Sequence, residues 1–86
     1  MQASSRIYKK DINLYEESAI DIVKSHKIYQ YRLKNSEGND DLHIGFIAEE
    51  SPAIRKDDTV SKDKAQSIAW KALQEVIERL EKVEAR

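Results

Sequence analysis

The segment from Asp63 to Arg86 constrains the fold more than any other part of this chain, because it contains neither glycine nor proline. Its apolar residues recur at alternating steps of four and three, the heptad spacing that lets helices pair in a coiled coil. We therefore predict one long helix of roughly 20 residues, about 30 Å in length. Asp63 and Gln66 have the spacing of a capping box, so we expect the helix to begin there. The predicted seam consists of Ala69, Leu73, Val76, Leu80 and Val83.

The apolar face of this predicted helix is wider than a two-stranded coiled coil requires. Trp70 and Ile77 flank the seam on one side, and Ala65 and Ala72 flank it on the other. With leucine at the a positions and valine at d, the seam favours three or four strands over two. Such a helix can equally pack against the rest of its own chain. Both uses stay open, and they can coexist if the first half packs inward and the last turns pair with copies.

Length and composition exclude several classes of protein. At 86 residues, 20 of them Leu, Ile, Val or Phe, the chain can form one small domain with a marginal core. A net charge of −1 with 36% charged residues does not indicate binding to nucleic acid or to an anionic membrane. The absence of cysteine excludes disulfides and thiolate metal sites. The longest uncharged apolar run, residues 44–48, is too short to span a bilayer. Such a soluble chain often gains burial from copies of itself or from a larger parent protein.

The N-terminal half is predicted to hold an extended lead-in followed by a helix. Residues 1–11 lack periodicity, so we place a single domain at residues 12–86. Asn13 and Glu16 have the spacing of a capping box, which predicts a helix from Asn13 to about residue 26. Its apolar stripe consists of Ile12, Tyr15, Ala19, Ile22, Val23 and His26.

The middle of the chain predicts a small antiparallel β-hairpin, which makes the fold class α+β. Tyr29, Tyr31 and Leu33 alternate with polar residues, as in a half-buried strand. After a polar loop at residues 35–41, a second strand is predicted with Leu42, Ile44 and Phe46 on its apolar face. We expect Pro52 in the first turn of a short helix and residues 55–58 to form a charged connector.

One glycine in the second predicted strand suggests a tightly packed site. Gly45 stands between apolar positions, where glycine costs stability unless another group approaches closely. We therefore expect Gly45→Val to disrupt packing, although valine is the better strand former.

Two serine–lysine pairs in the lead-in are candidates for nucleophilic chemistry. Ser4 lies five residues before Lys9, and Ser5 lies five before Lys10. A serine–lysine pair can carry out acyl chemistry when the lysine is neutral, because the free amine can accept the hydroxyl proton. Polar side chains in a lead-in are nonetheless mostly solvated, so the spacing alone does not establish a site.

The remaining candidates carry weaker signals. His26 and His43 are the only histidines, and neither has a second ligand at metal-binding spacing, so we expect no metal and no other cofactor. His43 is interpreted as a hydrogen-bonded surface or interface residue. Glu49 and Glu50 can either flank an active site or act as solvated acids in the first turn of a helix.

Three segments together resemble one family. Residues 43–50, His-Ile-Gly-Phe-Ile-Ala-Glu-Glu, resemble the hallmark of the intramolecular chaperone auto-processing domain, found at the C-terminus of bacteriophage tailspikes, tail fibres and endosialidases. Residues 4–12 are similar to the opening pattern of that family, a serine, a lysine five later and an isoleucine three beyond. Residues 65–80 resemble its final helix. The hallmark contributes His43, Gly45, Phe46, Glu49 and Glu50 as supporting residues.

The resemblance implies a function and a set of partners. Such a domain forms a homotrimer, templates folding of the upstream fibre region of the same polypeptide, and then cuts itself off. Ser4 would be the nucleophile, Lys9 its base, and the bond between Ala3 and Ser4 the one cleaved. Neither nucleic acid nor a membrane is an expected partner. The expected location is the host cytoplasm during virion assembly, with release from the mature fibre after cleavage.

The register of the dyad and the function both have alternatives. The family pattern favours Ser4 with Lys9 over Ser5 with Lys10, because only the first places Tyr8 before the lysine and Ile12 three beyond it. The family usually has Asp where this chain has Ser5, and Gln where it has Glu49. The alternative functions are an inert oligomerisation module of the same fold and a small adaptor whose C-terminal helix binds another protein.

Overall fold

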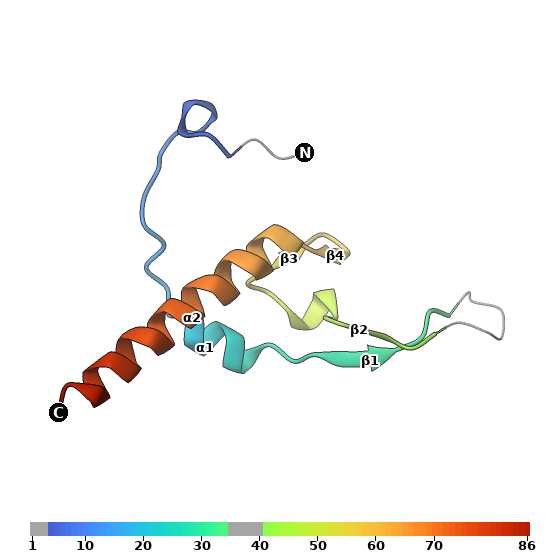
Figure 1. Ribbon diagram of the computed structural model, residues 1–86. Helices are drawn as coiled ribbons and strands as arrows, with labels where there is room; N and C mark the ends of the chain where they lie inside the picture. Colours follow the sequence, from blue (N-terminus) through green and yellow to red (C-terminus); the bar gives the residue numbers. More distant parts are fainter. Residues whose placement is uncertain (1–3, 35–40) are drawn as a thin grey trace.

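The computed structural model describes residues 4–34 and 41–86 and has an α+β fold (Figure 1). Two α-helices and two small antiparallel sheets confirm the predicted fold class. The elements in chain order are η1 (Arg6–Tyr8), α1 (Ala19–Ser25), β1 (Tyr29–Tyr31), β2 (His43–Gly45), η2 (Ala48–Glu50), β3 (Arg55–Lys56), β4 (Thr59–Val60) and α2 (Lys62–Glu84).

The long C-terminal helix is present, but it begins earlier than predicted. Helix α2 has 23 residues, and its N-cap is Ser61, whose hydroxyl accepts a hydrogen bond from the Lys64 amide at 3.1 Å. The capping box predicted at Asp63 is therefore wrong. Asp63 lies inside the first turn, where its negative charge is favourable next to the positive end of the helix dipole.

The first helix is much shorter than predicted. Helix α1 has seven residues and is capped by Ser18, whose hydroxyl accepts from the Asp21 amide at 3.3 Å. The predicted helix over residues 13–18 is wrong. The Asn13 side chain instead donates to the Asp11 carbonyl at 3.2 Å, and Asp11 adopts a positive φ of 54°. Such local side-chain bonds compete with helix formation.

The two helices are joined by the carboxylate of Glu75. Its Oε2 accepts the Ala19 amide at 2.9 Å, and its Oε1 accepts the Ile20 amide at 3.4 Å. These are amides of the first turn of α1, which have no partner within their own helix. Lys71 completes the joint, because its Nζ donates to Glu75 at 2.9 Å and to the Glu17 carbonyl at 2.8 Å. The hydrogen bonds from Lys71 and from Ala19 lower the pKa of Glu75.

The predicted hairpin is confirmed, but the apolar face predicted for its second strand is not. Strands β1 and β2 pair antiparallel, with Tyr29 opposite Gly45 and Tyr31 opposite His43. Because directly opposed residues share a face, His43 and Gly45 lie on the half-buried side with the two tyrosines. Ile44 consequently points outward and is 77% exposed, so the predicted apolar face through Ile44 is wrong.

The connection between the hairpin and α2 also differs from the prediction. The short helix η2 ends before Pro52, which lies in the following turn. The expected charged connector forms a second hairpin, in which Arg55 pairs with Val60. Asp57 adopts a positive φ of 54° in its turn, a conformation that aspartate tolerates better than most residues. The main-chain carbonyl of Asp57 also accepts a hydrogen bond from the Arg55 side chain at 2.8 Å.

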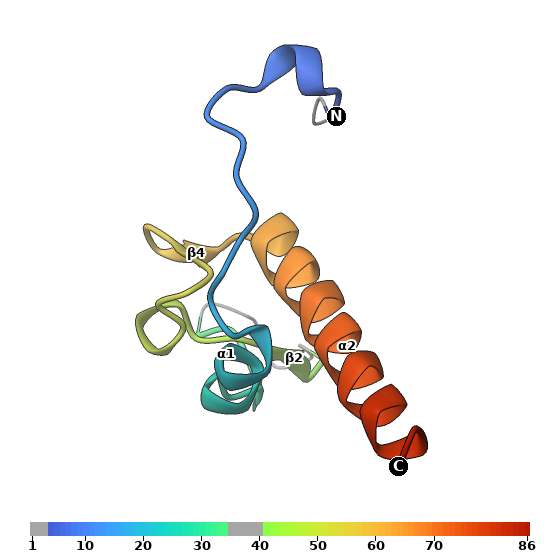
Figure 2. The same ribbon diagram turned by 90° about the vertical axis from the view of Figure 1, so that its left-hand side faces the viewer.

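The core of the single chain is small. The buried apolar residues of the described part are Ala19, Ala48, Ile54 and Ala72. The accessible surface is 8103 Å², against about 5,200 Å² for a typical folded monomer of this mass. The radius of gyration is 16.9 Å, against about 12 Å for a compact domain of this length. Part of the excess is the lead-in, which stands away from the helices in Figure 2.

The seam of α2 is open to solvent in the single chain. Leu73 is 56% exposed, Leu80 54% and Val83 61%. The face of α2 that meets α1 carries Ala72 and Glu75 instead, and the C-terminal turns extend beyond α1 (Figure 1). Within residues 4–34 and 41–86, the structure contains no helix with the length and apolarity needed to cross a membrane.

Replacement of Glu75 by alanine should weaken the joint between the helices. The first-turn amides of α1 lose their acceptor, so we expect Tm to fall by at least about 4 °C. Because folding lowers the pKa of Glu75, its contribution is present at neutral pH and is lost as pH falls below about 4.5. Thermal melts of Glu75→Ala and the parent chain should therefore converge in acid.

Glu78→Ala is the matched control, because Glu78 is an exposed residue one turn further along the same helix. Equal melting temperatures for Glu75→Ala and Glu78→Ala at pH 7 would show that the Glu75 contacts do not hold the helices together.

Candidate functional site

A single turn of 3-10 helix shapes the lead-in around the predicted dyad. Ser5 is the N-cap of η1, and its hydroxyl accepts the Ile7 amide at 3.3 Å. The Tyr8 amide donates to the Ser5 carbonyl at 3.2 Å, and the Lys9 amide donates to the Arg6 carbonyl at 3.1 Å. These three bonds reverse the chain direction between Ser5 and Lys9.

This reversal places the side chain of Lys9 in contact with the backbone of Ser4. The Lys9 Nζ donates to the main-chain carbonyl oxygen of Ser4 at 2.8 Å. The contact is to the carbonyl and not to the hydroxyl, and both residues are exposed. Ala3, the other half of the predicted cleavage site, lies outside the described residues. The geometry can therefore supply an amine beside the serine, although both groups face water in the single chain.

The hallmark segment forms a separate cluster around the hairpin. The rings of Tyr31 and His43 are stacked, with centroids 5.4 Å apart and planes at 16°. Tyr29 donates its hydroxyl proton to Glu50 at 2.9 Å, and this hydrogen bond raises the pKa of Tyr29 above its ordinary value of 10.0. Glu50 thus ties η2 to β1, although Glu49 and Glu50 are both exposed. Figures 1 and 2 both show the hairpin well separated from the lead-in of the same chain.

Gly45 does not have the close neighbour that its position suggested. A Cβ built on this residue would lie 3.5 Å from the Tyr31 hydroxyl oxygen and 3.7 Å from the Tyr31 ring, which are ordinary contact distances. Its φ also lies outside the left-handed region. The expectation that a close approach requires glycine here is therefore wrong for the single chain.

An apolar hollow of about 180 Å³ lies between the two helices and the hallmark segment. His26 is one of the residues that line this hollow, and its Nε2 accepts a hydrogen bond from the Ala53 amide at 3.2 Å. Among the described residues, no group of three or more His, Asp or Glu side chains is placed to hold a metal ion. The hollow is lined by Ile22, Val23, His26, Ile28, Phe46, Ile54, Ala65, Ile68 and Ala69.

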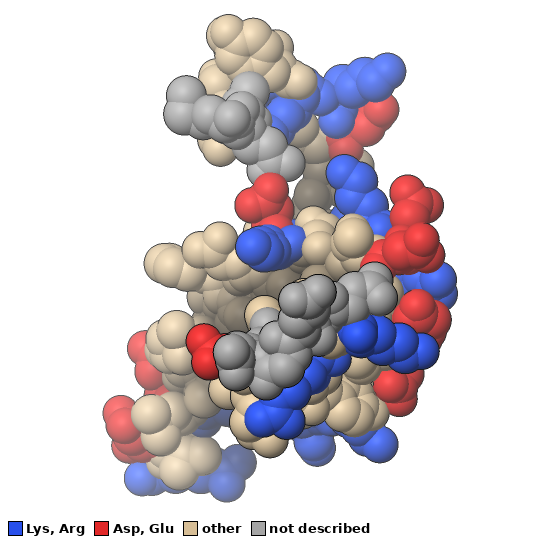
Figure 3. Space-filling view, turned by 90° about the vertical axis from the view of Figure 1, so that its right-hand side faces the viewer, with Lys and Arg blue, Asp and Glu red and all other residues tan. Residues whose placement is uncertain are grey.

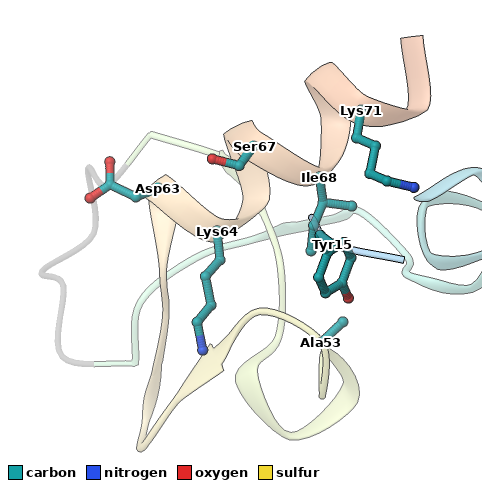
Figure 4. Close-up of a pocket in the computed structure, with 7 residues that line it drawn as sticks. All are labelled: Tyr15, Ala53, Asp63, Lys64, Ser67, Ile68 and Lys71. Atoms are coloured by element: carbon teal, nitrogen blue, oxygen red, sulfur yellow. The ribbon is translucent and has the colours of Figure 1, made fainter. Parts of the chain in front are cut away.

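A second hollow, of about 470 Å³, forms where the chain before α1 crosses α2 (Figure 4). Tyr15 lies between the helix and the Ala53 turn, and the Lys71 amine is 5.9 Å from the centre of its ring. The sequence did not point to this hollow, because it placed Tyr15 on a helix. Its lining is Tyr15, Ala53, Asp63, Lys64, Ser67, Ile68 and Lys71.

The face of the molecule shown in Figure 3 has no patch of a single charge. Basic and acidic side chains are mixed on the face shown in Figure 3, and neither sign forms a continuous patch there. This distribution agrees with a net charge of −1.

Comparison with known proteins identifies the family of this small α+β chain. The family described as chaperone of endosialidase, which carries a peptidase designation, matches residues 4–60. The match covers more than half of the chain, and the chain belongs to this family. Membership supports a role as an intramolecular chaperone, and autoproteolytic activity is a property that the family's designation indicates in general. Curated proteins and solved structures gave no match.

The first and last residues matched by the family coincide with features of this chain. It begins at Ser4, the serine predicted to start the released product, and it ends at Val60, the last residue of β4. Helix α2 lies outside the matched residues, so its resemblance to the family's final helix is not supported by this comparison. The support for the predicted seam of α2 is the heptad spacing of its apolar residues and their exposure to solvent.

Gly45→Ala should leave the single-chain fold intact. The added methyl group finds ordinary contact with Tyr31, and removal of a glycine reduces the entropy of the unfolded chain. We expect Tm to stay unchanged or to rise by a few degrees, on the order of the 0.4–1 kcal/mol typical of compatible sites. A loss of more than about 5 °C in a thermal melt would show that a tighter neighbour exists than the single chain provides.

Proposed function

We propose that this chain is a C-terminal intramolecular chaperone of a phage tailspike or tail fibre, which trimerises, promotes folding of the upstream fibre and then releases itself by cleavage before Ser4. The observation that carries the proposal is the contact between Lys9 and Ser4, at the residue where the family match begins. In this proposal the domain acts in the host cytoplasm during assembly and is absent from the mature fibre.

Trimerisation is supported by the apolar surface that the single chain leaves open. Large apolar side chains follow α2 from its third turn to its end, yet the described part of the chain buries few residues in its own core. Burial of such residues stabilises a protein by about 1.5–3 kcal/mol for each fully covered side chain. Association through the seam would therefore offset the small core. The exposed residues are Trp70, Leu73, Val76, Ile77, Leu80 and Val83.

A charge in the seam should abolish association. Leu80→Asp would bury one unpaired carboxylate in every subunit, three in each trimer, and such uncompensated charges are strongly destabilising. We expect light scattering to report loss of the trimer. Gln74→Asp is the control, because it adds the same charge at an exposed position outside the seam. A trimer that persists in Leu80→Asp would place the interface elsewhere.

The proposed reaction is an N-to-O acyl shift followed by hydrolysis. The Ser4 Oγ attacks the Ala3 carbonyl carbon while Lys9 accepts the hydroxyl proton. The bond between the Ala3 carbon and the Ser4 nitrogen breaks, the nitrogen takes a proton, and an ester to Ser4 remains. Water then hydrolyses the ester, which leaves a carboxylate on Ala3 and a free hydroxyl and amine on Ser4. Each chain performs this sequence once, so release is irreversible.

Exposure of the pair suggests why cleavage would depend on assembly. A lysine amine in water is almost entirely protonated at neutral pH and cannot accept the serine proton. A neighbouring subunit that covers the lead-in would favour the neutral amine by desolvation and would hold the scissile bond in place. In this proposal trimer formation completes the site, and cleavage reports correct folding of the fibre.

The turn geometry favours one register of the dyad. The amine that reaches a serine is that of Lys9, and the serine is Ser4. The Ser5 hydroxyl is already engaged as the cap of η1. These contacts support Ser4 with Lys9 over Ser5 with Lys10.

Substitution of either member of the dyad should stop cleavage. Ser4→Ala removes the attacking oxygen, and Lys9→Arg keeps the positive charge but removes a base that can become neutral. For the chain carried behind an upstream fibre segment, intact mass should show a released product beginning at Ser4, and no such product from either variant.

The same assays on Lys9→Arg and on the parent chain separate the candidate functions. Cleavage by Lys9→Arg at the parental rate would reduce Lys9 to an electrostatic role. A parent chain that forms a trimer but never cleaves would favour the inert oligomerisation module. A parent chain that stays monomeric and never cleaves would favour the adaptor.

A further inference from the structure

The turn that presents Lys9 to Ser4 is held by very few contacts. Residues of η1 are all exposed, and in the described part of the chain their hydrogen bonds stay within residues 4–9. Packing against the two helices therefore does not fix this turn. Its shape depends on the bonds that it makes to itself.

Apart from the contact of Lys9 with Ser4 itself, one of the bonds that close the turn in the described residues involves a side chain. Two are main-chain bonds, from Tyr8 to Ser5 and from Lys9 to Arg6, and any residue with a backbone N–H can donate them. The third is accepted by the Ser5 hydroxyl from the Ile7 amide at 3.3 Å. Ser5 has the extended backbone typical of an N-cap, with φ −66° and ψ 142°. The shape of the turn is thus sensitive to the residue at this position.

We propose that Ser5 is a positioning residue for the self-cleavage, because its hydroxyl caps the η1 turn and thereby holds the Lys9 amine beside Ser4. This inference rests on the proposed function, in which Ser4 and Lys9 are the dyad. Ser5 itself touches neither the scissile bond nor the transferred proton. It acts by raising the fraction of chains whose lead-in is turned back.

The proposal separates the two roles that a serine can play here. A nucleophile requires a hydroxyl, whereas an N-cap requires only a short side chain with an acceptor oxygen. Asparagine and aspartate are as effective at N-caps as serine, but they cannot form the ester in the proposed reaction. Alanine can do neither.

The test compares Ser5→Ala, Ser5→Asn and Ser5→Asp in the chain that carries an upstream fibre segment, with Ser4→Ala as the reference for a dead dyad. Cleavage is followed by intact mass over time, and trimer content by light scattering. Loss of one cap should lower the cleavage rate about fivefold in Ser5→Ala. Ser5→Asn and Ser5→Asp should restore the parental rate to within about twofold. The fraction of trimer should be the same in all variants, because none of these substitutions changes the seam of α2.

Three results would overturn the proposal. A parental rate in Ser5→Ala would show that the cap does not matter. A slow Ser5→Ala that neither Asn nor Asp rescues would show that Ser5 acts in another way. Complete loss in all three Ser5 variants, together with cleavage by Ser4→Ala, would make Ser5 the nucleophile and overturn the proposed dyad as well.

Discussion

The carboxylate of Glu75 is the interaction on which the folded body depends. It reaches from α2 to two first-turn amides of α1, and Lys71 ties the same carboxylate to the chain before α1. A helix of seven residues is too short to be stable alone, so it needs both this acceptor and its packing against α2. The hairpin and η2 follow α1 directly along the chain, and the hydrogen bond of His26 with Ala53 links them back to it.

This arrangement uses one face of α2 and leaves the seam of the same helix uncovered. In the described part of the chain, three of the four buried apolar residues are alanines, so the interior of one chain supplies little stabilisation. In the proposed function, a domain with such a core would gain stability chiefly from association of copies, which would link its folding to the concentration of chains. In the proposed function the same association covers the exposed lead-in. Folding, assembly and release would then depend on one interface.

Periodicity predicted the parts of the fold where neighbouring residues decide the structure. Alternation gave β1 and β2, and the absence of Gly and Pro gave α2. The errors lie where a local hydrogen bond or a strand register decides instead. The N-cap of α1 is Ser18, where the sequence predicted Asn13. Because His43 pairs with Tyr31 on the half-buried face, Ile44 lies on the opposite, exposed face. The five-residue spacing of Ser4 and Lys9 indicated a pair, and one turn of the chain does place the Lys9 amine next to the Ser4 carbonyl. The hollow at Tyr15 forms between segments that are far apart in the sequence, so no local spacing could predict it.

Sedimentation equilibrium of the 86-residue chain tests the central claim, that α2 assembles copies of this chain, most directly. The chain has a mass of 10.0 kDa, so we predict a single species of about three times that mass at micromolar concentration. A species of one chain mass, unchanged as the concentration rises, would contradict it.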